Sequence, residues 1–220
     1  MIKSRLLFRK EGRAQYISHL DLMHTMQRTF IRAGVRIRHT EGFNPHPYMS
    51  FILPLSVGCE SRCELMDFDL DDAFDPDAVP ALLNAAAPEG LTAVRVYPRT
   101  RKGAELKWLR VEGILEYDSG VPRDACRSLG ERFGLGGVVV RKRTKKGETE
   151  LDLTQNMREL AFSPAGEHAL RLEAVLSAQQ PSVNPGALTE AVGIYLPKLR
   201  PNFAHFTRLE VYDAEMRVFR

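Results

Sequence analysis

The chain has 220 residues, of which 44% are apolar and 27% charged, and its formal net charge is +3. It is long enough for two small hydrophobic cores. No apolar stretch approaches the roughly 18 residues needed to span a bilayer, which argues against a membrane partner. The three cysteines are odd in number and no apolar signal segment accompanies them, so a disulfide framework is not expected. These features predict a cytoplasmic protein that is neither secreted nor embedded.

The charge is unevenly distributed. Residues 1–50 hold nine Lys or Arg against three Asp or Glu, a balance of +6, whereas residues 51–100 hold three against nine. Clustering of charge on a face matters more for binding than the net total. The reversal suggests a dipolar surface, suited to docking a partner on one side.

The first half of the chain predicts β-α-β, a long loop from Glu41, and β-α-β. Ser18 is expected to cap the first helix with Asp21 in a capping box, and Gly34 stands where a left-handed residue would end it. Asp75 and Pro76 are expected to open the second helix. Alternating apolar residues predict strands at 2–8, 35–39, 63–70 and 91–97.

The second half repeats this order. Strands are expected at 106–117, 137–142, 168–176 and 206–212, with a hairpin arm at 150–153, and helices at 122–133 and, behind Asn184, at 185–192. The sequence therefore predicts an α+β fold of two tandem ferredoxin-like (βαββαβ) units, with a long loop inserted in the first. The expected domains are residues 1–98, carrying the loop, and 105–220, with a linker at 98–104.

Two stretches of the first half carry candidate site residues. His19, in the first helical turn, is not needed for capping, so it is a candidate acid or base, while Ser18 and Asp21 are explained by capping alone. In the loop, two prolines bracket His46 and stiffen the backbone, which would present Asn44 and His46 in fixed positions for a ligand. The alternative is a structural turn in which Asn44 bonds its own backbone and His46 packs on Tyr48 or Phe43.

Basic residues form three clusters. Arg28, Arg32, Arg36 and Arg38 lie on one helix and the strand after it, and could gather phosphates. Lys145 and Lys146, in a turn with Arg141, Lys142 and Arg143, form a second cluster. The third consists of Arg99, Arg101, Lys102, Lys107 and Arg110. The alternative for each cluster is a solvated charged face. The aromatic-rich signature of the common RNA-recognition module is absent.

No metal or cofactor is expected. Cys59 and Cys63 have the first spacing of the radical SAM cluster motif, but a third cysteine is missing, and a closed zinc or iron-sulfur site needs more ligands. Glycine-rich phosphate loops, nucleophile elbows and HExxH motifs are also absent.

Several motifs together resemble the radical SAM-linked protein family, a domain of unknown function. They are YISHLDLM (16–23), RAG (32–34), GFNPHP (42–47), PLSVG (54–58), ES (60–61), RTKKG (143–147), DL (152–153) and SVNP (182–185). Members of that family are commonly encoded beside, or fused to, a radical SAM enzyme. The resemblance implies association with radical SAM chemistry and with RNA metabolism, and it supplies no activity to carry over.

We therefore hypothesise an accessory protein that acts with a radical SAM protein and binds RNA or a nucleotide-like anion, without catalytic activity of its own. Its binding should weaken steeply with salt and through Arg36→Ala and Arg38→Ala. One alternative is a metal-independent endoribonuclease using His19 or His46, because tandem ferredoxin-like halves resemble CRISPR-type RNA-binding proteins, some of which cleave RNA. Another is a purely structural protein-protein adaptor.

Overall fold

The computed structural model describes residues 1–144 and 147–220, which divide into two compact units. The first unit holds Met1–Glu105 together with Arg220, and the second holds Leu106–Phe219. Each unit contains helices and antiparallel strands, so the chain has a mixed α+β fold, as predicted. The domain ranges expected from the sequence, 1–98 and 105–220, stay a prediction. Residues 98–104 lie within the first unit.

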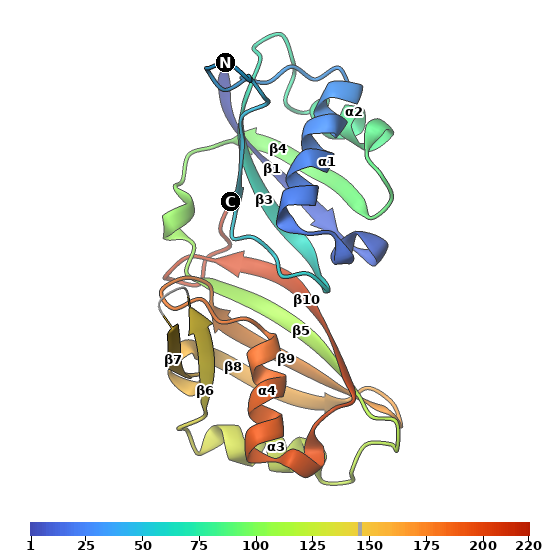
Figure 1. Ribbon diagram of the computed structural model, residues 1–220, viewed down its shortest axis with the longest axis vertical. Helices are drawn as coiled ribbons and strands as arrows, with labels where there is room; N and C mark the ends of the chain where they lie inside the picture. Colours follow the sequence, from blue (N-terminus) through green and yellow to red (C-terminus); the bar gives the residue numbers. More distant parts are fainter. Residues whose placement is uncertain (145–146) are drawn as a thin grey trace. The chain divides into compact units, whose positions relative to one another are not determined.

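The first unit consists of a sheet and two helices. Its strands are β1 (Ile2–Lys10), β2 (Met49–Ile52), β3 (Cys59–Leu70) and β4 (Leu91–Pro98). They pair antiparallel in the order β4-β1-β3-β2. Helix α1 (His19–Arg32) follows β1, helix α2 (Val79–Ala86) follows β3, and both lie over one face of the sheet (Figure 1). Two short 3-10 turns, η1 (Gly12–Tyr16) and η2 (Gly103–Glu105), complete the unit.

Helix α1 begins and ends where the sequence predicts. The Asp21 N–H donates to Ser18 Oγ at 3.1 Å, and the Ser18 hydroxyl donates to the Asp21 carboxylate at 2.7 Å. The first bond satisfies one of the backbone donors that a helix start leaves unpaired, and the second holds the Ser18 hydroxyl in place. Gly34 has a φ of +68° just after the last turn, as a left-handed cap requires.

The core of the first unit lies between α1, α2 and the sheet. Leu6 and Phe8 of β1 and Phe68 of β3 are almost fully buried, as are Met26 and Phe30 of α1. The rings of Phe30 and Phe68 meet edge to face with centroids 5.2 Å apart. Burial of this apolar stripe, rather than helix propensity alone, fixes α1 on the sheet.

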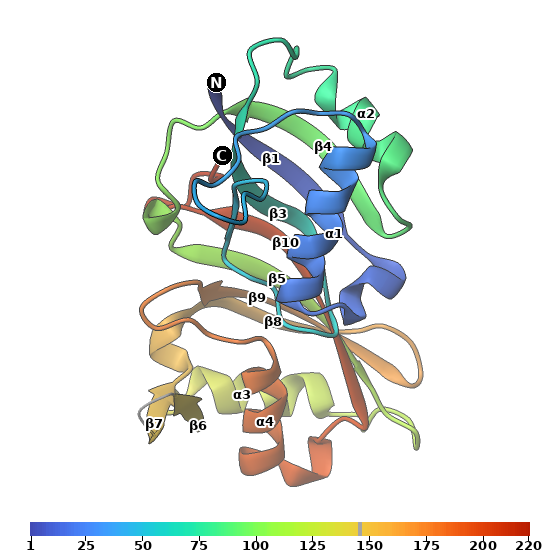
Figure 2. The same cartoon turned by 45° about the horizontal axis from the view of Figure 1, so that its top comes forward.

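The sheet strands of the second unit are β5 (Trp108–Glu116), β8 (Met157–Pro164), β9 (Ala169–Ser177) and β10 (Phe203–Tyr212). These strands pair antiparallel in the order β10-β5-β9-β8. Helices α3 (Ala125–Gly134) and α4 (Gly186–Tyr195) lie over one face of these strands (Figure 2). A separate hairpin, β6 (Val139–Thr144) with β7 (Gly147–Asp152), confirms the predicted hairpin arm. The short turns η3 (Thr154–Asn156) and η4 (Pro197–Leu199) lie in this unit.

Two strands were missed by the sequence analysis. The predicted long loop from Glu41 contains β2, whose four residues pair with Leu65–Phe68 of β3. Strand β8 was also not expected. Its alternation is interrupted by a bulge between Arg158 and Leu160, where Glu159 has a φ of +46°.

Two local predictions were wrong. Residues 35–39 do not form a strand: only single bridges join Ile37 to Leu70 and His39 to Pro47. Helix α2 begins at Val79 and not behind Asp75, because the Asp75 carboxylate accepts the Asp77 N–H and closes a turn before the helix.

Candidate functional site in the first unit

His19 lies in the first turn of α1 with an exposed side chain. Its ring meets the Phe51 ring of β2 edge to face, with centroids 5.3 Å apart. Asp21 is occupied by the cap of α1, as expected. The sequence therefore located His19 correctly at a helix start, but its structural neighbour is an aromatic ring of a strand that was not predicted.

Residues 39–48 form a narrow loop, called here the histidine loop. The Thr40 N–H donates to His46 O at 2.9 Å, and the His46 N–H donates to Thr40 Oγ1 at 3.2 Å. At its base, the Tyr48 N–H donates to Arg38 O at 2.8 Å. His46 is exposed and bonds Thr40 and Asn44, so its predicted packing on Tyr48 or Phe43 is not what the structure records. The loop is fixed by its own backbone.

Arg36 and Arg38 precede the histidine loop and face the carboxylates of β3 and the turn after it. Arg36 Nε lies 3.0 Å from Asp71 Oδ2 and the guanidinium stacks on Phe74, while Arg38 Nη1 lies 3.5 Å from Asp69 Oδ2 and stacks on Tyr48. A hydrogen bond from the Ala73 N–H, helped by Arg36, holds the pKa of Asp71 below its ordinary value.

The same row of carboxylates holds two further arginines. Arg5 of β1 lies directly opposite Asp67 of β3 in the register, and its guanidinium makes two bonds to that carboxylate, at 2.6 and 3.1 Å. Arg5 is completely buried, whereas the sequence placed it on the polar side of a half-buried strand. Arg99 bridges Asp67 and Asp69. We call this set the carboxylate ladder: Arg5, Arg36, Arg38, Arg99, Asp67, Asp69 and Asp71.

Arg28 and Arg32 line a different feature, called here the arginine cavity. It has a volume of about 380 Å³. Its lining consists of Arg13, Ala14, Ile17, Thr25, Arg28, Arg32, Pro88, Glu89 and Leu91. Three guanidinium groups and one carboxylate surround it, and Ala14, Ile17 and Leu91 supply apolar surface.

The turn η1 brings Arg13 to this cavity. The buried Lys10 ammonium donates to Gln15 O and Ile17 O, which holds η1 against the end of β1. The Glu11 N–H donates to Gly90 O at 2.8 Å, and a Cβ on Gly90 would stand 2.4 Å from Glu11 O. Only glycine permits this close approach, so Gly90 sets the distance between η1 and the start of β4.

The three guanidinium groups differ in their partners. Arg32 Nη2 donates to Ala86 O at 2.8 Å and to Thr29 Oγ1 at 3.3 Å. Within residues 1–144 and 147–220, neither Arg13 nor Arg28 has an ion pair or a side-chain hydrogen bond. Arg13 and Arg28 are both exposed, so these two positive groups at the cavity are open to solvent and to a ligand.

The structure does not gather the predicted site residues into one patch. His19 and Arg28 are nine residues apart on α1, which is about two and a half turns, so they project from opposite sides of the helix. On the His19 side, Gln27 Nε2 reaches Pro47 O of the histidine loop at 3.5 Å. The predicted set thus separates into the histidine loop with Asn44 and His46, the carboxylate ladder with Arg36 and Arg38, and the arginine cavity with Arg28 and Arg32.

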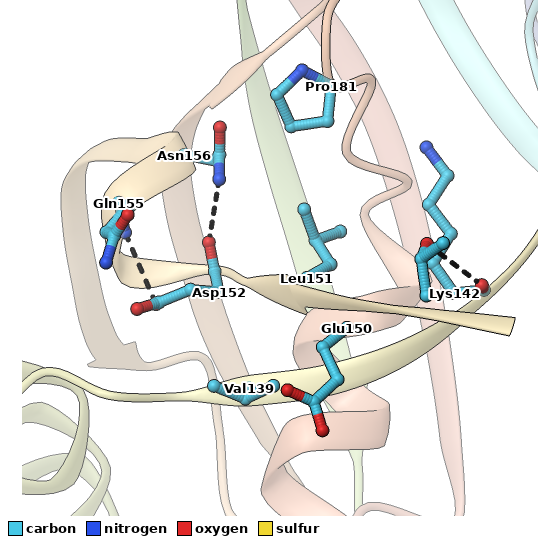
Figure 3. A pocket seen from close by; sticks show the side chains of 9 residues that line it. Val139, Lys142, Glu150, Leu151, Asp152, Gln155, Asn156 and Pro181 are labelled. Atoms are coloured by element: carbon cyan, nitrogen blue, oxygen red, sulfur yellow. Dashed lines mark hydrogen bonds between the residues drawn. The ribbon is translucent and has the colours of Figure 1, made fainter.

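The second unit contains a cavity of about 480 Å³ beside the β6–β7 hairpin, closed by Pro181 (Figure 3). Lys142 Nζ donates to Ser182 O at 2.5 Å. Bonds from the Thr154 hydroxyl and N–H hold the pKa of Asp152 below its ordinary value. The charged groups of this cavity are thus largely bonded to their neighbours. Lys145 and Lys146, predicted to bind a ligand, lie outside the described residues.

Cys59 and Cys63 are buried in β3 as free thiols. In the described part of the chain, no three His, Cys, Asp or Glu side chains gather as a metal site requires. None of the helices there has the length and apolar character that crossing a membrane would need.

Two features escaped the sequence analysis. Arg13 was overlooked because its separation from Arg28 in sequence gives no sign that η1 folds back to α1. Phe43 was considered only as a packing partner for His46, yet it is fully exposed. Its position between Gly42 and Asn44, both typical of turns, was the available signal.

The fold and these features define an α+β protein whose first unit carries a cationic cavity and a fixed polar loop. The chain belongs to the family described as "Uncharacterized protein conserved in bacteria (DUF2344)", whose model matches residues 3–185. That description names no radical SAM enzyme, so the association implied by the sequence motifs stays a prediction. No curated protein matches the chain.

Two solved structures are similar at low level. "Crystal Structure of an Unknown Protein from Galdieria sulphuraria" is 10% identical with a TM-score of 0.26, covering 97% of this chain and 98% of that one. "Crystal structure of putative glycine cleavage system transcriptional repressor" is 10% identical with a TM-score of 0.25. The match covers 94% of this chain and 99% of that one. Neither likeness carries an argument about function.

Proposed function

We propose that this protein binds RNA or a nucleotide-like anion at the arginine cavity and has no catalytic activity of its own. The main support is that Arg13 and Arg28 face the cavity with no partner in the described residues. A guanidinium offers a planar fork of donors that matches phosphate. Three arginines against Glu89 leave a local excess of 3 − 1 = +2, which favours an anion.

The cavity also suits the non-ionic part of such a ligand. Small-molecule sites have volumes of roughly 300–1,000 Å³, and about 380 Å³ is at the lower end of that range. Ile17 is half-buried and, with the buried Ala14 and Leu91 behind it, gives the wall of the cavity an apolar part against which a base can pack. Arg28 and Arg13 would then take the phosphate. A nucleotide unit, free or within RNA, combines both properties.

We further propose that both units are ferredoxin-like. In each, the first strand lies between the last and the third, and the second strand pairs with the third on its other side. The orders β4-β1-β3-β2 and β10-β5-β9-β8 support this, because a split βαβ sheet has the same order. In the second unit the β6–β7 hairpin would be an insertion.

The proposed partner is a radical SAM protein, and this part rests on the sequence resemblance alone. Co-expression of the chain with a radical SAM protein of the same cell, followed by gel filtration, tests it. Co-elution is expected, and separate elution would contradict the partnership.

The binding test uses fluorescence anisotropy with a labelled single-stranded RNA of mixed sequence. Hydrogen bonds to charged groups are worth about 1.5–3 kcal/mol, so Arg28→Ala should weaken binding roughly ten-fold or more. Arg127→Ala is a matched control, because Arg127 is an exposed helical arginine of the second unit, 3.9 Å from Glu131. Equal affinity of Arg28→Ala and wild type would overturn the proposed site.

The same samples test the endoribonuclease alternative. His19 packs on Phe51 and His46 bonds Thr40, so the described residues give the two imidazoles no shared neighbour. We therefore expect the RNA to stay intact. Cleavage that disappears in His19→Ala or His46→Ala would replace the binding proposal with an enzyme. Absence of any RNA binding, with a partner protein still bound, would favour the structural adaptor.

A further inference from the structure

Phe43 stands at the tip of the histidine loop with its whole side chain in solvent, at 106% of its reference area. Burying a phenylalanine is normally favourable by about 1.5–3 kcal/mol, so leaving one fully exposed on a fixed loop is unusual. Its neighbours Glu41, Gly42, Asn44 and Pro45 are exposed too. Of these four sequence neighbours, Pro45 alone is apolar.

The backbone of the loop is held on both sides of this residue. Thr40 and His46 bond across the loop through backbone and side chain, Pro47 is buried, and Gln27 of α1 reaches Pro47 O. Pro45 and Pro47 restrict the backbone further. Because the backbone that carries the ring is already ordered, a ligand that stacks on Phe43 does not have to order the loop as well.

The size and surroundings of the ring favour a single base over a protein surface. A stable protein interface buries about 800 Å² per partner around an apolar centre, and one isolated ring among polar residues does not supply that. One aromatic ring is enough for one nucleobase, because each unpaired base has a flat face that stacks. The cations nearest in sequence, Arg36 and Arg38, are paired with Asp71 and Asp69, so this contact is not mainly electrostatic.

Two polar groups beside the ring can meet the edge of a base. His46 Nδ1 lies 3.1 Å from Thr40 Oγ1 and 3.2 Å from Asn44 O, so Nδ1 is engaged within the loop and Nε2 is the ring nitrogen left for a ligand. The Asn44 side-chain amide has no bond to another described residue, so it offers both a donor and an acceptor. Unpaired RNA bases are recognised by this combination of stacking and edge contacts.

We propose that the histidine loop is a second RNA contact, in which Phe43 stacks on one unpaired base while Asn44 and His46 meet its edge. This inference rests on the proposed RNA binding, but it uses a different part of the first unit and a different physical interaction. The arginine cavity supplies the salt-dependent part of binding. The histidine loop supplies a stacking contribution to binding, which requires an unpaired base and therefore a single strand.

The test compares Phe43→Ala, Phe43→Trp and wild type by anisotropy, using a labelled single-stranded RNA and a duplex containing the same strand. Phe43→Ala should lose roughly ten-fold in single-strand affinity, with no change in the slope of log affinity against log salt. Phe43→Trp should bind at least as well as wild type. Duplex affinity should not change. Phe203→Ala is the matched control, because Phe203 is an exposed phenylalanine of the second unit.

The outcomes separate this inference from the proposed function. If Phe43→Ala binds the single strand like wild type while Arg28→Ala is weakened, the stacking site is refuted and the arginine cavity stands. If Phe43→Ala is weakened while Arg28→Ala is not, the cavity is refuted and the loop stands. An equal loss for single strand and duplex, or a loss for Phe43→Trp as large as for Phe43→Ala, would also refute stacking. A protein without affinity for either RNA refutes both.

Discussion

The arginine cavity and the carboxylate ladder draw on the same run of arginines, yet they differ in what the positive charge can do. Arg36 and Arg38 keep 67% and 52% of their side chains exposed, but each has a carboxylate within 3.5 Å. Arg28 belongs to the same basic segment but lies within α1, before Arg36 and Arg38. It has no ion pair or side-chain hydrogen bond among the described residues. Exposure alone therefore does not distinguish these arginines, and the difference between them is the intramolecular counter-charge.

The largest expected effect is on stability and comes from the buried end of the ladder. Asp67→Ala would leave the completely buried Arg5 without its bidentate carboxylate. Breaking a buried pair costs about 3–5 kcal/mol, so the free energy of unfolding in urea should fall by roughly that amount. Glu105→Ala, which breaks an exposed pair with Arg101, should cost about 1 kcal/mol or less. Equal losses would show that the ladder is not structural.

The second effect concerns binding at the cavity. In the double variant Arg13→Ala/Arg28→Ala, both unpaired guanidinium groups are lost, and single-strand RNA affinity should fall by about a hundred-fold if each contributes roughly ten-fold. Arg28→Lys should recover only part of the loss, because an ammonium is a point charge without the planar fork. Full recovery with lysine would show that charge alone is recognised there.

A third, smaller effect separates the two regions directly. The sequence alone predicted that Arg36→Ala and Arg38→Ala would weaken RNA binding. Because both guanidinium groups are paired with Asp69 and Asp71, we now expect a change below about two-fold, together with a stability loss of about 1 kcal/mol or less. A ten-fold loss of RNA affinity, measured by anisotropy, would show instead that Arg36 and Arg38 belong to the binding site, as the sequence alone predicted.

The smallest effect is a pH dependence at Asp71. Its folded pKa is lowered, first by the Ala73 N–H and also by Arg36, from an ordinary value of 3.8. Asp71 therefore stabilises the fold above the unfolded pKa, and this contribution is lost as the pH falls through the lower folded pKa. The stability difference between wild type and Asp71→Asn should thus be constant from pH 7 to about 5 and shrink in more acidic urea titrations. A difference that grows on acidification would contradict the assignment.

The sequence predicted those parts of the fold that depend on local chemistry. Ser18, Asp21 and Gly34 specify both ends of α1 within a few residues. Strand β2 could not be predicted, because four residues are too few for a recognisable alternation of apolar and polar side chains. Its position depends on pairing with β3. Strand β8 was hidden by its bulge at Glu159. In both cases a non-local pairing, not a propensity, determines the structure.

The same distinction explains the candidate site. The stiff loop around His46 follows from its prolines, and the sequence identified it. Whether an arginine is paired depends on residues far along the chain: Arg38 meets Asp69, and Arg13 meets the α1 side of the cavity through the fold of η1. No spacing rule links these positions. The sequence therefore located the basic segment but could not tell its available charges from its neutralised ones.

The most direct measurement of the central claim is the salt dependence of single-stranded RNA binding. Each phosphate contact contributes about 0.7 to the slope of log affinity against log salt. We expect Arg13→Ala/Arg28→Ala to reduce that slope by about 1.4 relative to wild type, and Arg36→Ala/Arg38→Ala to leave it unchanged. The opposite pattern, with the slope lowered only by the second double variant, would contradict the account.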